Sequence, residues 1–387
     1  MKELILRKRN ILLFLIPLGI ILNEWAKHST FIAEEVFAKR IYKVISQVIG
    51  FLTGWLPFSL AEVIVAVGPF VILVLLIRQI IRVIRAKKII SEYSQKSVGQ
   101  IRFQLIMTAV QNILCLISVI FFVYILLCGI NYYRYSVQYY LGLSVENSSV
   151  EELEGLLIEL AEKANSLRSN LTTENEDGVY ILPMSKRELG QEARQAYKNL
   201  AKEYEIFEGN YPAPKPVLFS KLMSYTQITG VFTCWTMEAN VNIDISPYSI
   251  GSTMCHELAH LHGFMREDEA NYISYMACLA SDSLDLQYSG TMLALIHTGN
   301  ALYRKDANRY MEVYQKYYSE AVVRDLIANN KYWDKFEETK VAETAEKVND
   351  TYLKANNQTD GTQSYGRMVD LLLAEYRQRL INIAESD

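Results

Sequence analysis

Histidine is scarce in this sequence, with five residues in a chain of 387. Three of the five, His256, His260 and His262, nevertheless lie within seven consecutive positions, beside several acidic residues. Little histidine is left for chemistry elsewhere in the chain. The segment "STMCHELAHLHGFMREDEANYISYMACLA", from Ser252 to Ala280, is therefore the first place to look for a functional site.

An excess of positive charge and a set of closely spaced cysteines are also lacking. The formal net charge is −4 and the isoelectric point is about 5.9, so the composition gives no reason to expect a nucleic-acid partner. Cys115 and Cys128 lie in an apolar segment, and Cys234, Cys255 and Cys278 are spread over the rest of the chain. This spacing argues against a disulfide framework, and we expect free, mostly buried thiols.

The sequence does contain long apolar runs. Three of them, all in the N-terminal third, reach the roughly 20 residues that a helix needs to cross a bilayer. We predict membrane helices at about residues 11–28, 58–82 and 106–130. No small-residue cleavage site follows the first run, so we interpret it as an anchor and not as a signal peptide. The loop between the first two runs has the spacing of an amphipathic helix on the membrane surface.

Cations are concentrated before the first run, at the end of the second, and between the second and the third. These cations are Lys2, Arg7, Lys8, Arg9, Arg78, Arg82, Arg85, Lys87, Lys88, Lys96 and Arg102. Such residues accumulate on the cytoplasmic side of a membrane. The N-terminus and the loop between the second and third runs are therefore both predicted to be cytoplasmic. With three spans, the chain after about Tyr133 then lies outside the cytoplasm. The sequence therefore predicts a multi-pass protein of the cell (plasma) membrane, with a membrane region over 1–133 and an extracytoplasmic domain over 134–387.

The outer domain is predicted to be mainly α with a small β region. A capping box at Ser149 and Glu152 precedes apolar residues at helical spacing, and "KRELGQEARQAYKNLAKEYEIF" continues as a second helix. The segment "ITGVFTCWTMEANVNID" is rich in strand-forming residues and predicts a hairpin or a small sheet. Helices are expected again after Ala280, with a polar loop at "KANNQTDGTQ".

The clustered histidines form the motif H-E-x-x-H. A Ser-Pro pair upstream is a good helix start and Gly263 is a good helix stop, so one helix is predicted between them. On it, His256 and His260 are four residues apart and project from one face, where two imidazoles can hold one zinc ion. Glu257 is placed to take a proton from a metal-bound water.

A catalytic zinc site needs a third protein ligand and an open position for water. Three carboxylates, Glu267, Asp268 and Glu269, begin a second predicted helix. Glu267 is preferred as the ligand because it shares a helix face with Asn271, which can then support the site from behind. Glu269 stays open as the alternative ligand.

These residues resemble the zincin metallopeptidases of the thermolysin-like, glutamate-ligand type, in which H-E-x-x-H precedes a helix carrying E-x-x-x-D or E-x-x-A-D/N. The stretches here are "HELAH" and "EDEAN". Four further stretches carry a closer resemblance: "YPAPKPVLFSKLM", "TGVF", "MEANVN" and "SYGRMVDLLLAEY". With them, most of the chain is similar to an uncharacterised family of bacterial membrane-anchored zinc metallopeptidases, described as a domain of unknown function.

Two features depart from the thermolysin-like pattern. Only six residues separate His260 from Glu267, fewer than is usual, and Asn271 replaces the usual aspartate. The short gap is similar to the metzincin pattern as far as Gly263. Arg266, however, stands where that pattern has its third histidine, and arginine cannot bind zinc.

The resemblance implies hydrolysis of peptide bonds in an α+β zincin-like metallopeptidase domain with Zn²⁺ as cofactor. Zinc held by His256, His260 and Glu267 would lower the pKa of its bound water and polarise the scissile carbonyl. Glu257 would act as general base and pass the proton to the leaving amine. The expected partners are a peptide or protein substrate and the lipid bilayer. Candidates for an oxyanion donor are Tyr365 and Arg367.

Two other classes of function stay open. An inactive zincin-like protein would bind a peptide or an envelope partner, although a pure binding module has no need of an intact Glu257. A membrane sensor with a structural zinc would fill the fourth metal position with protein, but Cys255 points away from the histidine face. His262 is offset from that face and His297 lies on an apolar helix, so both are interpreted as structural.

The loop charges give a testable prediction of orientation. A cysteine introduced by Lys87→Cys should not react with a membrane-impermeant thiol reagent in intact cells, whereas one introduced by Asn147→Cys should react. Permeabilised cells are the control, because both positions should then be labelled. Labelling of the Lys87→Cys protein in intact cells would contradict the predicted orientation.

Overall fold

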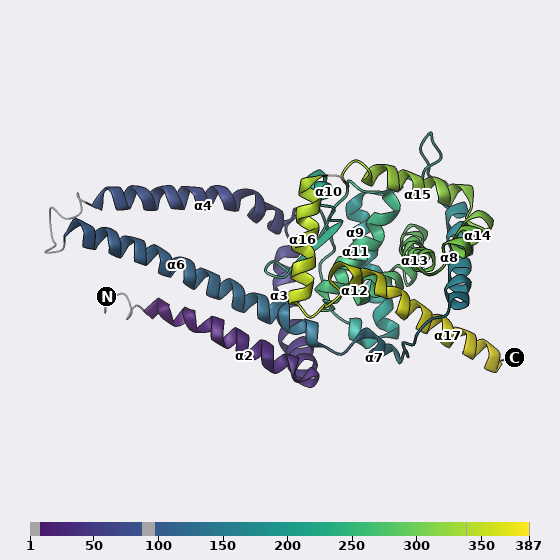
Figure 1. The fold of residues 1–387 in the computed structure, drawn as a ribbon, viewed down its shortest axis with the longest axis horizontal. Helices are drawn as coiled ribbons and strands as arrows, with labels where there is room; N and C mark the ends of the chain where they lie inside the picture. Colours follow the sequence, from purple (N-terminus) through teal and green to yellow (C-terminus); the bar gives the residue numbers. More distant parts are fainter. Residues whose placement is uncertain (1–7, 87–96, 338, 387) are drawn as a thin grey trace.

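The chain folds into a helical body from which three long helices extend on one side (Figure 1). The computed structural model describes residues 8–86, 97–337 and 339–386. Most of these residues are helical, and a single sheet of three short strands is found among them. The predicted class, mainly α with a small β region and about three membrane helices, is confirmed at this level.

The three extended helices are long and apolar enough to cross a membrane. They cover Lys8–Lys27, Leu60–Ile84 and Val98–Tyr133, close to the predicted ranges. The first comprises η1 (Lys8–Phe14) and α2 (Leu15–Lys27), the second is α4 (Leu60–Ile84), and the third comprises α6 (Val98–Leu127) and η3 (Gly129–Tyr133). Only 6% of the most apolar part of α4 is buried, so its side chains are available to lipid.

Part of the charge pattern behind the predicted orientation falls outside the described residues. Lys2, Arg7, Lys87, Lys88 and Lys96 belong to this part. The ends of α4 and α6 that lead to the 87–96 loop lie at the tip farthest from the body (Figure 1). The orientation itself stays a prediction.

The loop predicted to hold an amphipathic helix forms two helical segments, η2 (Ile32–Tyr42) and α3 (Lys43–Gly54). Their buried side chains reach the helix that carries the histidine motif, α11 (Pro247–Leu261). The Tyr42 hydroxyl donates hydrogen bonds to the carbonyls of His260 at 3.1 Å and Leu261 at 3.0 Å. These carbonyls lie in the last turn of α11, where helical donors run out; the His260 carbonyl also accepts a hydrogen bond from the Gly263 amide at 2.9 Å.

A buried ion pair adds a second link to the same helix end. Arg134, just after η3, donates to both carboxylate oxygens of Glu34 in η2 at 2.9 Å and to the carbonyl of His262 at 3.1 Å. The Glu34 side chain is fully buried, and the Arg134 side chain is 5% exposed. Segments that adjoin the first and third membrane helices therefore both hold the end of α11.

The body is built from helices packed around α11 and α13 (Leu284–Lys305). The predicted capping box of Ser149 and Glu152 begins α8 (Val150–Asn170). The other helices of the body are α7 (Val137–Leu141), α9 (Lys186–Glu203), η4 (Glu205–Phe207), α10 (Ser220–Tyr225), α12 (Glu267–Leu279), α14 (Ala307–Tyr317), α15 (Glu320–Trp333), α16 (Lys340–Ala355), η5 (Gly361–Arg367) and α17 (Met368–Ser386). All five cysteines are buried thiols, as expected.

The sheet has the order β1-β3-β2. Strand β3 (Glu238–Val241) is central; it pairs parallel with β1 (Lys215–Pro216) and antiparallel with β2 (Gly230–Thr233). The predicted hairpin is thus confirmed, whereas β1 was not predicted because it lies in a proline-rich stretch. Strand β2 pairs on one side only, which leaves it at an edge of the sheet.

The buried Arg134–Glu34 pair gives a stability prediction. Arg134→Met leaves the Glu34 carboxylate buried without its partner, which costs about 3–5 kcal/mol of unfolding free energy. Urea unfolding of the full chain in detergent measures this loss. The matched control is Lys39→Met, because the Lys39–Glu35 pair is solvent-exposed and such a pair contributes about 1 kcal/mol or less. Equal stabilities of the two variants would contradict the prediction.

Candidate metal centre

Helix α11 has the boundaries that the sequence predicted. It begins with Pro247 at its first position and ends at Leu261, shortly before Gly263. Gly263 has a φ of +90°, and a Cβ there would meet the Arg134 guanidinium at 2.8 Å, so the turn needs a glycine. The chain then reverses into α12, which begins at Glu267. This reversal places the first turn of α12 beside the end of α11.

The reversal brings His256, His260 and Glu267 together. The two histidine Nε2 atoms lie 3.0 Å apart, and Glu267 Oε2 lies 3.1 Å from His256 Nε2 and 3.5 Å from His260 Nε2. Tetrahedral zinc with bonds of about 2.1 Å would separate its ligand atoms by about 3.4 Å. The three observed separations are near this value. We call these three residues the candidate metal centre.

Each histidine is held from behind through its other ring nitrogen. His256 Nδ1 lies 2.7 Å from Asn271 Oδ1, and His260 Nδ1 lies 2.8 Å from the carbonyl of Phe264. Both partners are acceptors, so each Nδ1 carries a proton and each Nε2 faces the other ligand atoms, where a metal ion can take the place of a proton. Asn271 takes the supporting position expected from its spacing. The Phe264 carbonyl was not predicted.

The electrostatics of the centre favour a bound cation. Burial raises the pKa of Glu267, but His260 and His256 outweigh burial and lower it to about 2. Burial lowers the pKa of His260, but Glu267 reverses this and raises it to about 9. The Oε2 atom of Glu267 is buried, with the Nε2 atoms of His256 and His260 within 3.5 Å. A carboxylate that stays ionised and two inward-facing imidazoles suit a divalent metal ion.

The Glu257 side chain extends from α11 toward the edge strand β2. Its side chain packs against Gly230 of β2, where a Cβ would overlap the carboxylate. Burial raises the pKa of Glu257, and its Oε2 atom is buried without a hydrogen-bond partner. The sequence did not indicate the role of Gly230, because the strand and the helix come together only in the folded chain.

The other acids of α12 face away from the histidines. Glu269 Oε1 accepts hydrogen bonds from the amide of Val137 at 2.8 Å and from Arg266 at 2.6 Å. Asp268 lies 3.8 Å from the Arg367 guanidinium. Of the three acids, only Glu267 contributes to the cluster of possible metal ligands.

The remaining predicted residues take different places. The side chain of Tyr365 lies outside the described part of the structure. Arg367 lies 3.1 Å from Asp360 and near Asp268, so its charge is already compensated. His262 stacks on Tyr197 with ring centroids 4.4 Å apart and lies against the tilted Tyr211 ring at 4.2 Å, consistent with a structural role.

Two further residues bear on the centre. Burial lowers the pKa of His297 to about 4, and His256 is close enough to contribute to this shift. Gln358 is 1% exposed, and its Oε1 accepts a hydrogen bond from the Glu267 amide at 3.3 Å. Gln358 comes from the predicted polar loop 91 residues downstream, and no local pattern marked it. It supports the first turn of α12, where amides lack helical partners.

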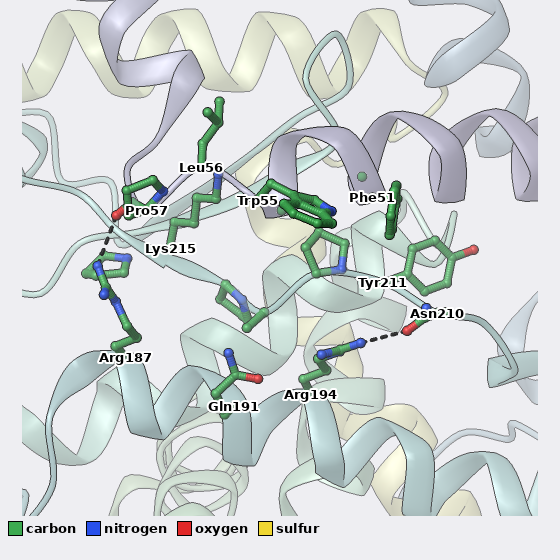
Figure 2. Close-up of a pocket in the computed structure, with 16 residues that line it drawn as sticks. Phe51, Trp55, Leu56, Pro57, Arg187, Gln191, Arg194, Asn210, Tyr211 and Lys215 are labelled. Atoms are coloured by element: carbon green, nitrogen blue, oxygen red, sulfur yellow. Dashed lines mark hydrogen bonds between the residues drawn. The ribbon is translucent and has the colours of Figure 1, made fainter.

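A separate cavity of about 360 Å³ lies between α3, α9 and the segment 210–216. Figure 2 shows Arg187 bonded to the Pro57 carbonyl at 3.0 Å and Arg194 bonded to Asn210 at 2.6 Å. None of the candidate metal ligands lines this cavity. The two arginines connect α9 to the α3–α4 connection and to the proline-rich segment.

Comparison with known proteins agrees with the resemblance at the level of family. One family model matches residues 37–373, a range that contains α4, α6, the sheet and the candidate metal centre. No curated protein and no solved structure matches the chain. Because the match covers most of the sequence, the chain belongs to the family described as protein of unknown function DUF3810.

Proposed function

We propose that this protein is a membrane-anchored, zinc-dependent peptidase with a zincin-like domain. The observation that carries the proposal is the cluster of His256, His260 and Glu267, whose ligand atoms all lie within 4.8 Å of one another. Glu257 lies on the same helix and has the burial expected of a base. The ligand set of two imidazoles and one carboxylate is that of catalytic zinc sites with an open fourth position.

The residues of the centre fit zinc by chemistry and by spacing. His256, His260 and Glu267 would hold the ion, and Asn271 and the Phe264 carbonyl would orient the two imidazoles. When bound, zinc supplies a Lewis acid that makes water acidic and polarises a carbonyl group. The chain supplies the base: Glu257 takes a proton from the attacking water and delivers it to the amine that leaves. Burial makes Glu257 a better base than an exposed carboxylate.

The edge strand offers a place for an extended substrate. One edge of β2 pairs with β3 from Gly230↔Val241 to Thr233↔Glu238, and the other edge has no strand beside it among the described residues. A peptide bound there would form main-chain hydrogen bonds, which do not depend on its side chains, so peptides of many sequences could bind. Gly230 lies against Glu257. A peptide on this edge would therefore pass close to the base.

We place the catalytic body on the outer face of the cell membrane. Three helices are long and apolar enough to span a bilayer, and the body adjoins one end of all three (Figure 1). The cations Arg78, Arg82, Arg85 and Arg102 lie toward the other ends of α4 and α6. The accumulation of cations on the cytoplasmic side supports this orientation.

Zinc content tests the metal centre. The purified full chain should bind about one equivalent of zinc, and His256→Ala or His260→Ala should weaken binding by on the order of a hundredfold, because each removes one of three ligands. Zinc titration against a chelator of known affinity measures this loss. The matched control is His28→Ala, since His28 is exposed. Unchanged affinity in both ligand variants would refute the assignment.

Variants of the acids separate catalysis from metal binding. Glu257→Gln should keep one zinc and lose peptide hydrolysis by on the order of a hundredfold or more, because glutamine cannot act as a base. Glu267→Gln should weaken zinc binding, while Glu269→Gln should leave it nearly unchanged. A peptide library read by mass spectrometry supplies the activity measurement. If the zinc-loaded wild type cleaves nothing and binds peptides as well as Glu257→Gln does, the protein is a binding module.

A further inference from the structure

We infer that the substrate is a polypeptide anchored in the bilayer, whose segment just outside the membrane reaches the metal centre from between α4 and α6. This inference rests on the proposed function and names its substrate class. Three observations carry it: the divergence of these two helices, the apolar residues at their body ends, and the short path from there to the candidate metal centre.

The ends of α4 and α6 that are farthest from the body lie close together, and the two helices diverge toward the body (Figure 1). Their mutual hydrogen bonds lie at the far end, from Gln79 Nε2 to the Leu105 carbonyl at 2.9 Å and from Arg102 Nε to the Val83 carbonyl at 3.2 Å. Among the described residues, no hydrogen bond joins the body ends of the two helices. A membrane-embedded segment can therefore lie between the two helices near the body without breaking a hydrogen bond between them.

The body ends of the two helices are attached to either side of the β2–β3 turn. Glu238, the first residue of β3, accepts hydrogen bonds from the amides of Leu60 at 3.0 Å and Ala61 at 2.8 Å at the start of α4. Trp235, in the turn, packs against Tyr124 of α6 with ring centroids 6.4 Å apart. The strand that adjoins Glu257 thus ends where the two membrane helices meet the body.

Large apolar side chains are exposed around this place. Leu218 is 81% exposed and Leu222 is 63% exposed, and the adjacent backbone is tied to α4, because Glu62 accepts hydrogen bonds from the amides of Leu218 and Phe219. These leucines are therefore held next to the body end of a membrane helix, where lipid or a lipid-anchored chain would cover them.

Helix α16 adds an apolar stripe on the other side. Val341, Val348 and Tyr352 are 52%, 64% and 40% exposed, and their spacing places them on one face of the helix. The Tyr352 ring contacts Tyr124 of α6, so this face is turned toward the third membrane helix. We call the exposed residues on both sides the apolar rim. The apolar rim consists of Leu218, Leu222, Trp235, Val341, Val348 and Tyr352.

Cys128 links the rim to the turn that leads into the candidate metal centre, because its Sγ lies 3.6 Å from the Tyr352 hydroxyl. Cys128, at the end of α6, lies with its Sγ 3.8 Å from the Sδ of Met265 in the turn between His260 and Glu267. On β2, Val231 is 40% exposed and follows Gly230, which touches Glu257. A water-soluble peptide gains little from an apolar entrance, whereas a chain that emerges from lipid keeps its apolar part covered up to the site of cleavage.

The test uses one randomised ten-residue segment in three forms: free in solution, joined directly to an apolar helix of about 20 residues, and joined to the same helix through a long Gly/Ser linker. The zinc-loaded full chain is reconstituted in vesicles of phosphatidylethanolamine and phosphatidylglycerol. Cleavage of the directly joined form should exceed that of the other two by about tenfold or more. The linker form controls for concentration at the membrane surface. Equal cleavage of the two anchored forms would overturn the inference.

Rim variants identify the entrance. Leu222→Glu and Val348→Glu should lower the ratio of directly joined to free cleavage about tenfold, because a charge at the rim disfavours an apolar chain. The matched control is Ile327→Glu, since Ile327 is 56% exposed on α15 and lies outside the rim. An unchanged ratio in both rim variants would overturn the entry route.

A photoreactive residue in the anchored segment provides a readout that does not depend on cleavage. If wild type cleaves no form but the anchored segment crosslinks to β2, the entry route stands and the peptidase function fails. If peptides are cleaved without preference and no crosslink to β2 forms, the function stands and the entry route fails.

Discussion

The arrangement of this protein depends on how the C-terminal end of α11 is satisfied. At the end of this buried helix, Tyr42 donates to the carbonyls of His260 and Leu261, Arg134 donates to that of His262, and the Gly263 amide also donates to that of His260. Tyr42 ends the segment after the first membrane helix, and Arg134 follows the third. The hydrogen bonds that a buried helix end requires are thus supplied by residues that adjoin two of the helices long and apolar enough to cross a membrane. The helix that carries the histidine motif is in this way fixed relative to the membrane helices.

The same constraint shapes the candidate metal centre. Gly263 lets the chain reverse against Arg134, and this reversal brings Glu267 to the two imidazoles. A buried carboxylate beside two inward-facing nitrogens is costly unless a proton or a metal ion lies between them. The Nδ1 atoms of His256 and His260 bond to Asn271 and to the Phe264 carbonyl. This leaves both Nε2 atoms directed at Glu267, where they can bind a metal ion. The clustering of these three possible metal ligands therefore follows from the packing of two helices as well as from the motif.

Local signals in the sequence predicted much of this site. The Ser-Pro start and Gly263 bound α11, the spacing of the motif placed two histidines on one face, and Asn271 was expected behind them. The preferred Glu267 lies at the histidines, whereas Glu269 bonds to Val137 and Arg266. Contacts between distant segments could not be predicted, because no periodicity links Gln358 to Glu267 or Gly230 to Glu257. Strand β1 escaped prediction because it lies in a proline-rich stretch; its pairing with β3 is accompanied by the buried Lys215–Glu238 ion pair.

The measurement that tests this account most directly is X-ray absorption at the zinc edge of the purified full chain. The account predicts two imidazole nitrogens at about 2.0–2.1 Å, a carboxylate oxygen at about 2.0–2.2 Å and one further light ligand from solvent. In the Glu267→Gln protein the carboxylate contribution should be lost, while Glu269→Gln should leave the spectrum unchanged. A sulfur shell at about 2.3 Å, or a spectrum that does not change when His256 and His260 are replaced, would contradict the metal centre.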